Sequence, residues 1–252
     1  MRDVALVLHR ARLENRAFWR NPAAAFFTVV FPLVFLVAAT VAMAAPLGSG
    51  SQAARFYTPA IMAFALITAC FTNLGMGVVL AREAGILKRL RGTPLPTWAY
   101  VAGRVLQASF VTAVQATLIG LYGAVVHGVS LPIERLPLLL VTLTFGAAAF
   151  SVLGLAVTAI VPDAGSAPAV INATILPLLL ISNVLVPLDH GLLATLAGIF
   201  PVRHLSDALS GLYDPAALVL AGDVTISLLI VGAWGVAGLV VTLRTFVWSP
   251  RG

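Results

Sequence analysis

The chain has 252 residues and a formal net charge of +6; 60% of its residues are hydrophobic and only 10% are charged. Soluble domains carry about 25% charged residues, so this composition excludes a soluble domain, which could not cover a water-facing surface. The positive charge does not indicate nucleic-acid binding, because the Lys and Arg residues lie in short segments between long apolar runs. We therefore expect an integral membrane protein with no nucleic-acid partner.

Residues 1–22 precede the first long apolar run and are predicted to form an amphipathic helix over 2–20. Apolar residues recur at helical spacing from Val4 to Ala11, and five arginines are distributed around the rest of the segment. Such a helix lies in the membrane interface with its arginines near anionic headgroups, so membrane lipid is an expected partner. A basic leader that only sets the topology is the alternative interpretation.

Six apolar stretches are long enough to cross a bilayer, which requires about 20 residues of helix. None of them contains Asp, Glu, Lys, Arg or His, and none alternates as a membrane barrel strand does. The first exceeds the apolar region of a cleaved signal, about 7–15 residues, so we expect it to be retained. The sequence predicts an all-α integral membrane protein whose domain 23–252 holds six spans: about 23–45, 57–80, 105–126, 137–161, 168–187 and 224–243.

The distribution of Lys and Arg among the connections predicts the orientation of these spans. Five precede the first span, five lie between the second and third, and two follow the sixth, whereas the opposite side holds only Arg55, Arg135 and Arg203. Cytoplasmic segments carry the excess of positive charge. We therefore expect a multi-pass protein of the cell membrane with both termini in the cytoplasm.

The connection between the second and third spans predicts a short basic amphipathic helix over 82–91. Ile86, Leu87 and Leu90 share one side, and a glycine and a proline follow. A helix of this kind projecting from the cytoplasmic face is suited to docking in an acidic-rimmed groove of a partner. A helix that only lies on the membrane surface is nearly as compatible with the pattern.

The stretch 188–222 is irregular and predicts two half-helices that dip in from the outer face and return. Its two apolar pieces, 192–200 and 202–213, are each too short to cross a membrane. Pro201 lies between them and discourages one continuous helix. A plain surface loop is the alternative.

The absence of recognisable catalytic motifs in the sequence disfavours an enzyme. The chain lacks a G-x-x-x-x-G-K-[ST] phosphate loop, its only lysine is Lys88, and its four histidines show no metal-ligand spacing. Asp207 follows His204 by three residues, but an ion pair on a helix surface explains them at least as well as catalysis. The spans also lack the ionisable side chains that proton- or ion-coupled pumps generally need. We expect no catalytic residue, metal or cofactor bound by this chain.

The segment after the second span carries a motif that includes Arg82, Glu83, Gly85, Leu90, Thr93 and Pro94. These residues match an R-E-x-G-x-x-x-x-L-x-x-T-P pattern. With this pattern the segment resembles the corresponding segment of ABC-2 type permeases, the membrane subunits of ATP-binding-cassette exporters. A weaker P-x-x-x-x-x-x-A-x-R/S-G element of that family is similar to Pro201, Ala208, Ser210 and Gly211. The resemblance extends over nearly the whole chain.

The resemblance implies a membrane subunit whose ATP and Mg are bound by a separate P-loop ATPase subunit, expected in two copies. A second permease, identical or related, would complete the transport path. The helix at 82–94 would be a coupling helix seated on the ATPase, with Glu83 paired to a basic residue there. The residues assigned to coupling are Arg82, Glu83, Gly85, Leu87, Lys88, Arg89, Leu90, Thr93 and Pro94.

The half-helices within 188–222 would cap the outer end of the pathway and include Pro201, Arg203, Asp207 and Gly211. Polar side chains stranded in the spans are candidates for lining the pathway or packing helices. For each of them, an interhelical hydrogen bond is the simpler explanation. They are Asn73, Gln107, Gln115, Asn172 and Asn183, with Thr174 and Ser182 in addition.

The chain resembles the daunorubicin-resistance-like efflux branch of the family, which implies outward transport of an apolar or amphipathic compound and a role in antibiotic resistance. The few polar groups in the spans also favour such a drug or lipid-like cargo. Export of polysaccharide chains by a sibling branch is the alternative. A non-ABC transporter or an assembly factor is the competing class, although a stand-alone transporter would not need the element at 82–94.

Overall fold

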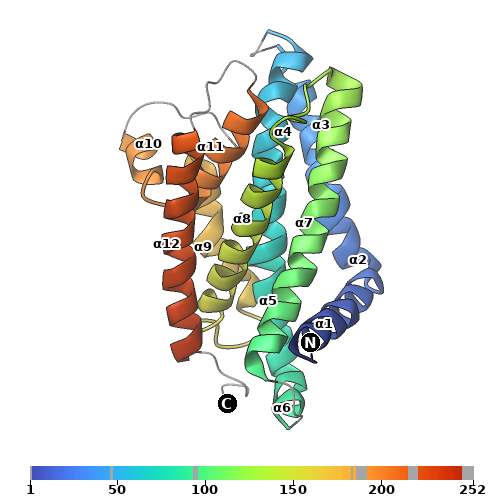
Figure 1. The fold of residues 1–252 in the computed structure, drawn as a ribbon, viewed down its shortest axis with the longest axis vertical. Coiled ribbons are helices and arrows are strands. Elements are labelled where there is room, and N and C mark those ends of the chain that lie inside the picture. The colour runs from blue at the N-terminus through green and yellow to red at the C-terminus, as the bar shows by residue number, and fades with distance from the viewer. Residues whose placement is uncertain are drawn as a thin grey trace.

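In the computed structural model of the protein, the described residues are 2–45, 48–92, 96–182, 184–185, 192–214 and 221–245. Thr93, Pro94 and Asn183, which the sequence marks as coupling or pathway residues, lie outside these ranges. The described part is all-helical and forms an elongated bundle (Figure 1). This confirms the predicted all-α class.

Two long helices each contain a π-helical segment. The first runs from α2 through η1 (Phe26–Val30) to α3, and the second from α4 through η2 (Thr68–Asn73) to α5. The α-helices are α1 Arg2–Trp19, α2 Pro22–Ala25, α3 Phe31–Ala42, α4 Gly50–Ile67, α5 Leu74–Glu83, α6 Ile86–Arg91, α7 Thr97–His127, α8 Leu136–Val157, α9 Ala167–Ile181, α10 Leu192–Ala197, α11 Pro201–Tyr213 and α12 Ala221–Thr245.

Five helices are long and apolar enough to cross a membrane, and they coincide with five of the six predicted spans. The remaining prediction, 168–187, is too long. Helix α9 there has 15 residues, and at about 1.5 Å per residue it reaches about 22 Å, less than the hydrocarbon core of about 30 Å. Hydropathy alone does not detect where this helix ends, because the apolar run continues past Ser182. The helix ends before a serine followed by an asparagine, and both residue types are weak helix formers.

Helix α1 forms over the segment predicted to be amphipathic. It packs obliquely across α7 at the end of the bundle that carries α6 (Figure 1). The carboxyl end of α12 lies at this same end. The charged residues Arg82, Glu83 and Arg104 are also located here, beyond the apolar stretches of their helices. The interfacial position of α1 stays a prediction.

The opposite end of the bundle carries α10 and α11 (Figure 1). Two helices therefore replace the plain loop that was the alternative for this stretch. Pro201 begins α11 instead of lying between the two, which suits proline because the first turn of a helix needs no backbone donor there. Val202, Leu205 and Leu209 are fully buried, and α11 packs against α4, α8 and α12.

The second long helix is the centre of the packing, and Gly154 of α8 determines how closely α8 approaches it. A Cβ atom at position 154 would lie 2.6 Å from the Phe71 carbonyl oxygen in η2. No side chain fits at that distance, and the obstacle is backbone that cannot rotate away. Glycine therefore permits α8 to contact η2 directly.

Replacing Gly154 with Ala should lower the free energy of unfolding by about 1–3 kcal/mol, because the added methyl group overpacks the α8–η2 contact. Thermal unfolding of the purified protein in detergent measures this. Gly50→Ala is the matched control, since its new Cβ would meet its nearest neighbour, the His127 ring, at an ordinary 3.7 Å. Equal stability of the two variants would contradict the close contact.

Candidate functional site

The helix predicted over 82–91 is interrupted in the structure. Helix α5 ends at Glu83 and α6 begins at Ile86. Between them Gly85 has φ 67°, in the left-handed region, and no atom lies within 4 Å of where its Cβ would be. Backbone conformation and not space therefore requires glycine here. The chain turns at this joint, and α6 forms the tip of the bundle (Figure 1).

Arg82 holds the end of α5 against the connection between α8 and α9. The residue is only 2% exposed. Its Nη1 donates to the Thr158 carbonyl oxygen at 3.2 Å, and its Nη2 donates to the carbonyl oxygens of Val161 at 2.7 Å and Pro162 at 3.4 Å. Carbonyl groups at and beyond a helix C-terminus lack intrahelical donors, so they are suitable acceptors for a buried cation. Arg82 therefore faces the bundle and not a docking surface.

Charged side chains occupy the outer face of this end. Glu83, Lys88 and Arg89 are all exposed, so one acidic and two basic groups are available to a partner. This face, together with α6, is called the α6 tip below (residues 83–91). Exposed charges at an interface affect partner choice and the rate of encounter more than affinity.

The predicted apolar side of this helix is divided between the bundle and the surface. Leu87 is completely buried and Leu90 packs against the core, whereas Ile86 is 45% exposed. The turn at Gly85 rotates α6 relative to α5, which separates residues that one continuous helix would keep together. Leu87 thus anchors the α6 tip, and Ile86 adds an apolar contact to its outer face.

Helix α1 is held to α7 by a cluster of charged and aromatic side chains. Arg10 forms an ion pair with Glu14, and Arg104 Nε lies 3.5 Å from the same carboxylate oxygen. The guanidinium carbons of Arg10 and Arg104 lie 4.9 and 5.6 Å from the centre of the buried Tyr100 ring. Cation–π attraction and one shared carboxylate therefore join the two helices.

The π-helical segments are bridged by polar side chains. Asn73 Nδ2 in η2 donates to Thr28 Oγ1 in η1 at 2.7 Å, and Gln115 Nε2 of α7 donates to the Thr28 carbonyl oxygen. A π-helical turn departs from the regular α-helical hydrogen-bond pattern, and here neighbouring spans bond to it. Asn73 and Gln115 thus make the interhelical hydrogen bonds that were the simpler explanation for stranded polar residues.

The other candidate pathway residues differ in their bonding. Thr174 and Ser182 donate to carbonyl oxygens of their own helix, those of Val170 and Leu178. Gln107 and Asn172 are half-buried, and their side chains form no hydrogen bond with the rest of the described chain. These two amides remain available for a ligand or a second subunit.

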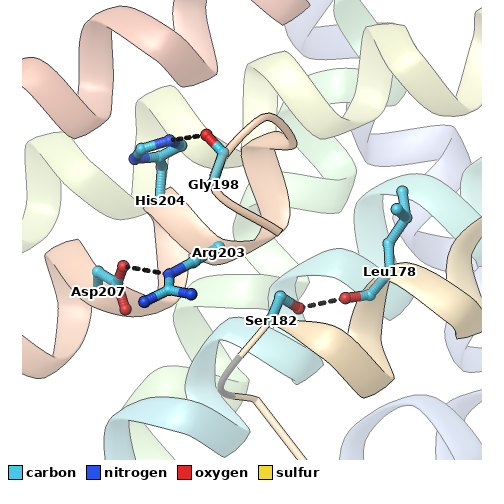
Figure 2. Close-up of polar contacts among 6 residues, drawn as sticks. All are labelled: Leu178, Ser182, Gly198, Arg203, His204 and Asp207. Carbon is cyan, nitrogen blue, oxygen red and sulfur yellow. Dashed lines mark hydrogen bonds and ion pairs between the residues drawn. The ribbon is translucent and has the colours of Figure 1, made fainter. Parts of the chain in front are cut away.

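Local polar contacts hold the α10–α11 region (Figure 2). Arg203 Nε lies 3.3 Å from Asp207 Oδ2, one helical turn away. His204 Nε2 donates to the Gly198 carbonyl oxygen at 2.9 Å, which secures the turn before α11. The predicted His204–Asp207 pair is therefore wrong, because the carboxylate pairs with the arginine and the imidazole bonds to backbone.

The carboxyl end of α11 is bonded by Arg135, which lies just before α8. Its Nη1 donates to the carbonyl oxygens of Gly211 at 3.1 Å and Asp214 at 3.0 Å. A cation next to the last carbonyl groups of a helix is favourable. Gly211 thus supplies a backbone acceptor, whereas Pro201 and Arg203 belong to the first turn of the same helix.

Sequence reasoning missed Glu14 and Tyr100 as structural contacts and counted Arg104 and Arg135 only as topology charges. The pairs they form join segments far apart in the chain. No local periodicity signals such a pair. The one available signal is that Arg104 lies within a turn of the third predicted span, where a charge needs a partner.

Comparison with known proteins identifies a family. A family model described as ABC-2 type transporter matches residues 6–213, which include helices from α1 to α11. A search of curated proteins finds no significant match.

Replacing Arg82 with Lys should loosen the joint between α5 and the α8–α9 connection, because one ammonium group cannot reproduce the guanidinium contacts to three carbonyl oxygens. Loss of hydrogen bonds to a charged donor, at about 1.5–3 kcal/mol, predicts at least about tenfold faster amide exchange around residues 158–161 and in α6. Hydrogen-exchange mass spectrometry in detergent measures this. The exposed Arg89→Lys is the control, and equal exchange in both variants would contradict the role of Arg82.

Proposed function

We propose that this chain, which belongs to the ABC-2 type transporter family, exports an apolar or amphipathic compound using ATP hydrolysed by a separate subunit. The family and the apolar spans make it a multi-pass membrane permease of an ABC transporter, a subunit that associates with an ABC ATPase. The observation that carries the finer proposal is the α6 tip. It presents exposed charges to the outside and is tied to the bundle by the buried Arg82.

The α6 tip is the docking element for the ATPase. Two ATPase copies bind ATP and Mg, and their closure displaces the docked tip. Glu83 pairs with a basic residue of the partner, while Lys88 and Arg89 meet its acidic rim. Because nucleotide binding favours the closed partner, its binding energy shifts the permease between two states, as coupling requires.

Arg82 transmits the displacement into the spans. It is bonded to the α8–α9 connection, so a shift of α5 draws the ends of α8 and α9 with it. Leu87 limits independent motion of the tip because it is fully buried. The described contacts thus support a rigid link from the tip to α8, which packs against α11 at the other end.

The chain lies in the cell membrane with both termini in the cytoplasm and pairs with a second permease copy or a related permease. In this orientation the α6 tip faces the cytoplasm, and α10 and α11 cap the outer end of the pathway. The excess of Lys and Arg at the α6 end supports this orientation. The placement of α10 and α11 at the opposite end of the bundle supports the cap.

The bonding of polar side chains in the spans supports an apolar or amphipathic cargo, such as a drug expelled in antibiotic resistance. Asn73, Gln115, Thr174 and Ser182 are each hydrogen-bonded within the protein. A polysaccharide path needs a continuous polar track, so glycan export is the alternative with less support. A stand-alone transporter would not need an exposed charged tip.

Reversing the charge of Glu83 with Glu83→Lys should abolish stable association with the ATPase and ATP-driven export, because a like charge then faces the partner's basic residue. Insertion and folding should be unaffected, since Glu83 is exposed. Purification from the native host in mild detergent, followed by mass spectrometry of co-purifying ATPase, measures the association. Glu134→Lys is the matched control, since Glu134 is exposed like Glu83 but belongs to the connection at the opposite end.

Two outcomes would contradict the proposal. The first is full ATPase association and undiminished transport in the Glu83→Lys variant. The second is the unmodified chain repeatedly arriving without any P-loop ATPase, under conditions that keep a known ABC complex intact. The second result would remove ATP coupling altogether and favour a stand-alone function.

A further inference from the structure

A small cavity lies between α1, the first span, α5 and α7. Its volume is about 260 Å³, and its polar lining includes Glu14, Asn73, Arg104 and Gln107. Most of the remaining lining is apolar, including Leu80 and Val111. A polar corner inside an otherwise apolar pocket is the arrangement by which sites orient a ligand. None of these residues belongs to the α6 tip.

Arg104 supplies the charge of this corner, and its buried Nε has no hydrogen-bond partner in the described chain. Its side chain is 14% exposed, and its contact with Glu14 is a 3.5 Å ion pair. The same guanidinium lies over the buried Tyr100 ring. Gly77 of α5 provides its space, because a Cβ at 77 would lie 2.8 Å from Arg104 Nη1.

The cluster formed by Arg10, Glu14 and Arg104 has a net positive charge, although only Glu14 and Arg104 of these three line the cavity. Arg10 and Arg104 are both cationic, and Glu14 is the one carboxylate that pairs with either of them in the described chain. An excess cation that is largely withdrawn from water is unfavourable unless an anion or several acceptors accompany it. The cavity beside Arg104 is where such an anion fits.

Gln107 adds a second unfilled donor. It follows Arg104 by three residues on α7, so both side chains lie on one face of the helix. The Gln107 amide is half-buried, lines the cavity and has no hydrogen-bond partner in the described chain. The amide can therefore donate to an acceptor that enters the cavity beside the Arg104 guanidinium.

We propose that the cavity binds the phosphate headgroup of an anionic phospholipid. Arg104 and Gln107 donate to the phosphate oxygens, and the acyl chains extend into the bilayer past Leu80, which lines the cavity and is 51% exposed. The cavity is smaller than the roughly 300–1,000 Å³ of drug-sized sites, so it accepts a headgroup and not a whole lipid. Helix α1 forms one wall, and amphipathic interfacial helices lie at headgroup depth.

Lipid binding at this cavity does not depend on ATP coupling, because it involves the permease and lipid alone. A bound anionic lipid would join α1, α5 and α7 by neutralising the excess charge between them. Binding at Arg104 is a different interaction from the general attraction of anionic lipid to the basic surface of α1.

Photoactivatable phosphatidylglycerol, added to the full-length permease in mixed micelles, tests the site. Labelling should map to the α5 and α7 peptides that line the cavity. Unlabelled phosphatidylglycerol should compete at least about tenfold better than phosphatidylcholine, because phosphatidylcholine carries the same phosphate but adds a choline cation that the excess positive charge of the cluster repels. Inorganic phosphate should not compete at millimolar concentration.

Three variants keep the test independent of folding. Arg104→Gln and Gln107→Leu remove a donor, and each should weaken labelling by about tenfold or somewhat less. Gly77→Ala retains every charge and displaces only the flexible end of Arg104, so it should weaken labelling while thermal stability in detergent is unchanged. Arg12→Gln, which removes an exposed arginine of α1, is the matched control and should label as the unmodified protein does.

The proposal is overturned if Arg12→Gln weakens labelling as much as Arg104→Gln, since lipid would then respond only to surface charge. It is equally overturned if Gly77→Ala labels normally, or if phosphatidylcholine competes as well as phosphatidylglycerol. Effective competition by inorganic phosphate would identify a site for free anions and not for lipid. Loss of ATPase association in the Glu83→Lys variant leaves this lipid labelling unchanged, so the two proposals fail separately.

Discussion

The buried guanidinium of Arg82 is the interaction on which the arrangement of the α6 end depends. A cation that is withdrawn from water needs several acceptors, and the carbonyl groups at the end of α8 and in the following connection supply them. This requirement places the end of the second long helix beside the start of α9. The turn at Gly85 then directs α6 away from the bundle. The exposed charges of the α6 tip are consequently carried by a rigid base.

Elsewhere in the bundle, a few polar bonds and close backbone contacts determine how the spans pack. Lipid is as apolar as leucine, so burying leucine between spans provides little preference for one helix register over another. Thr28 instead receives bonds from Asn73 and Gln115, which aligns three spans at one level. Gly154 lets α8 touch the backbone of η2. These contacts are specific because each has one geometry.

At each end of the bundle an arginine side chain donates hydrogen bonds to carbonyl groups near the end of a helix. Arg135 bonds two carbonyl groups at the end of α11, as Arg82 bonds three carbonyl groups at and after the end of α8. Arg104 differs because it contacts side chains, the Glu14 carboxylate and the Tyr100 ring, and bonds no carbonyl group of the described chain. Arg82 and Arg135 stabilise the fold through backbone bonds, whereas Arg104 beside a cavity is the basis of the lipid proposal.

The sequence by itself determined the all-α membrane class, five of the spans, the helix of the N-terminal segment and the family motif after the second span. Those features depend on hydropathy over about 20 residues or on residues adjacent in the chain. It also located the two helices of the α10–α11 region, from two short apolar pieces beside a proline. Glu83, Lys88 and Arg89 were likewise recognisable as one charged segment.

Only the tertiary structure decided which of these charges face outward. Arg82 and Glu83 are neighbours in the motif, yet one is buried against carbonyl groups of α8 and the other is exposed. The partners of Arg104 and His204, and the shorter extent of α9, likewise escaped prediction. Each depends on which distant backbone group or side chain comes within about 3 Å, the range of a hydrogen bond. Hydropathy and spacing carry no information about such contacts, because helix packing and not local sequence brings the groups together.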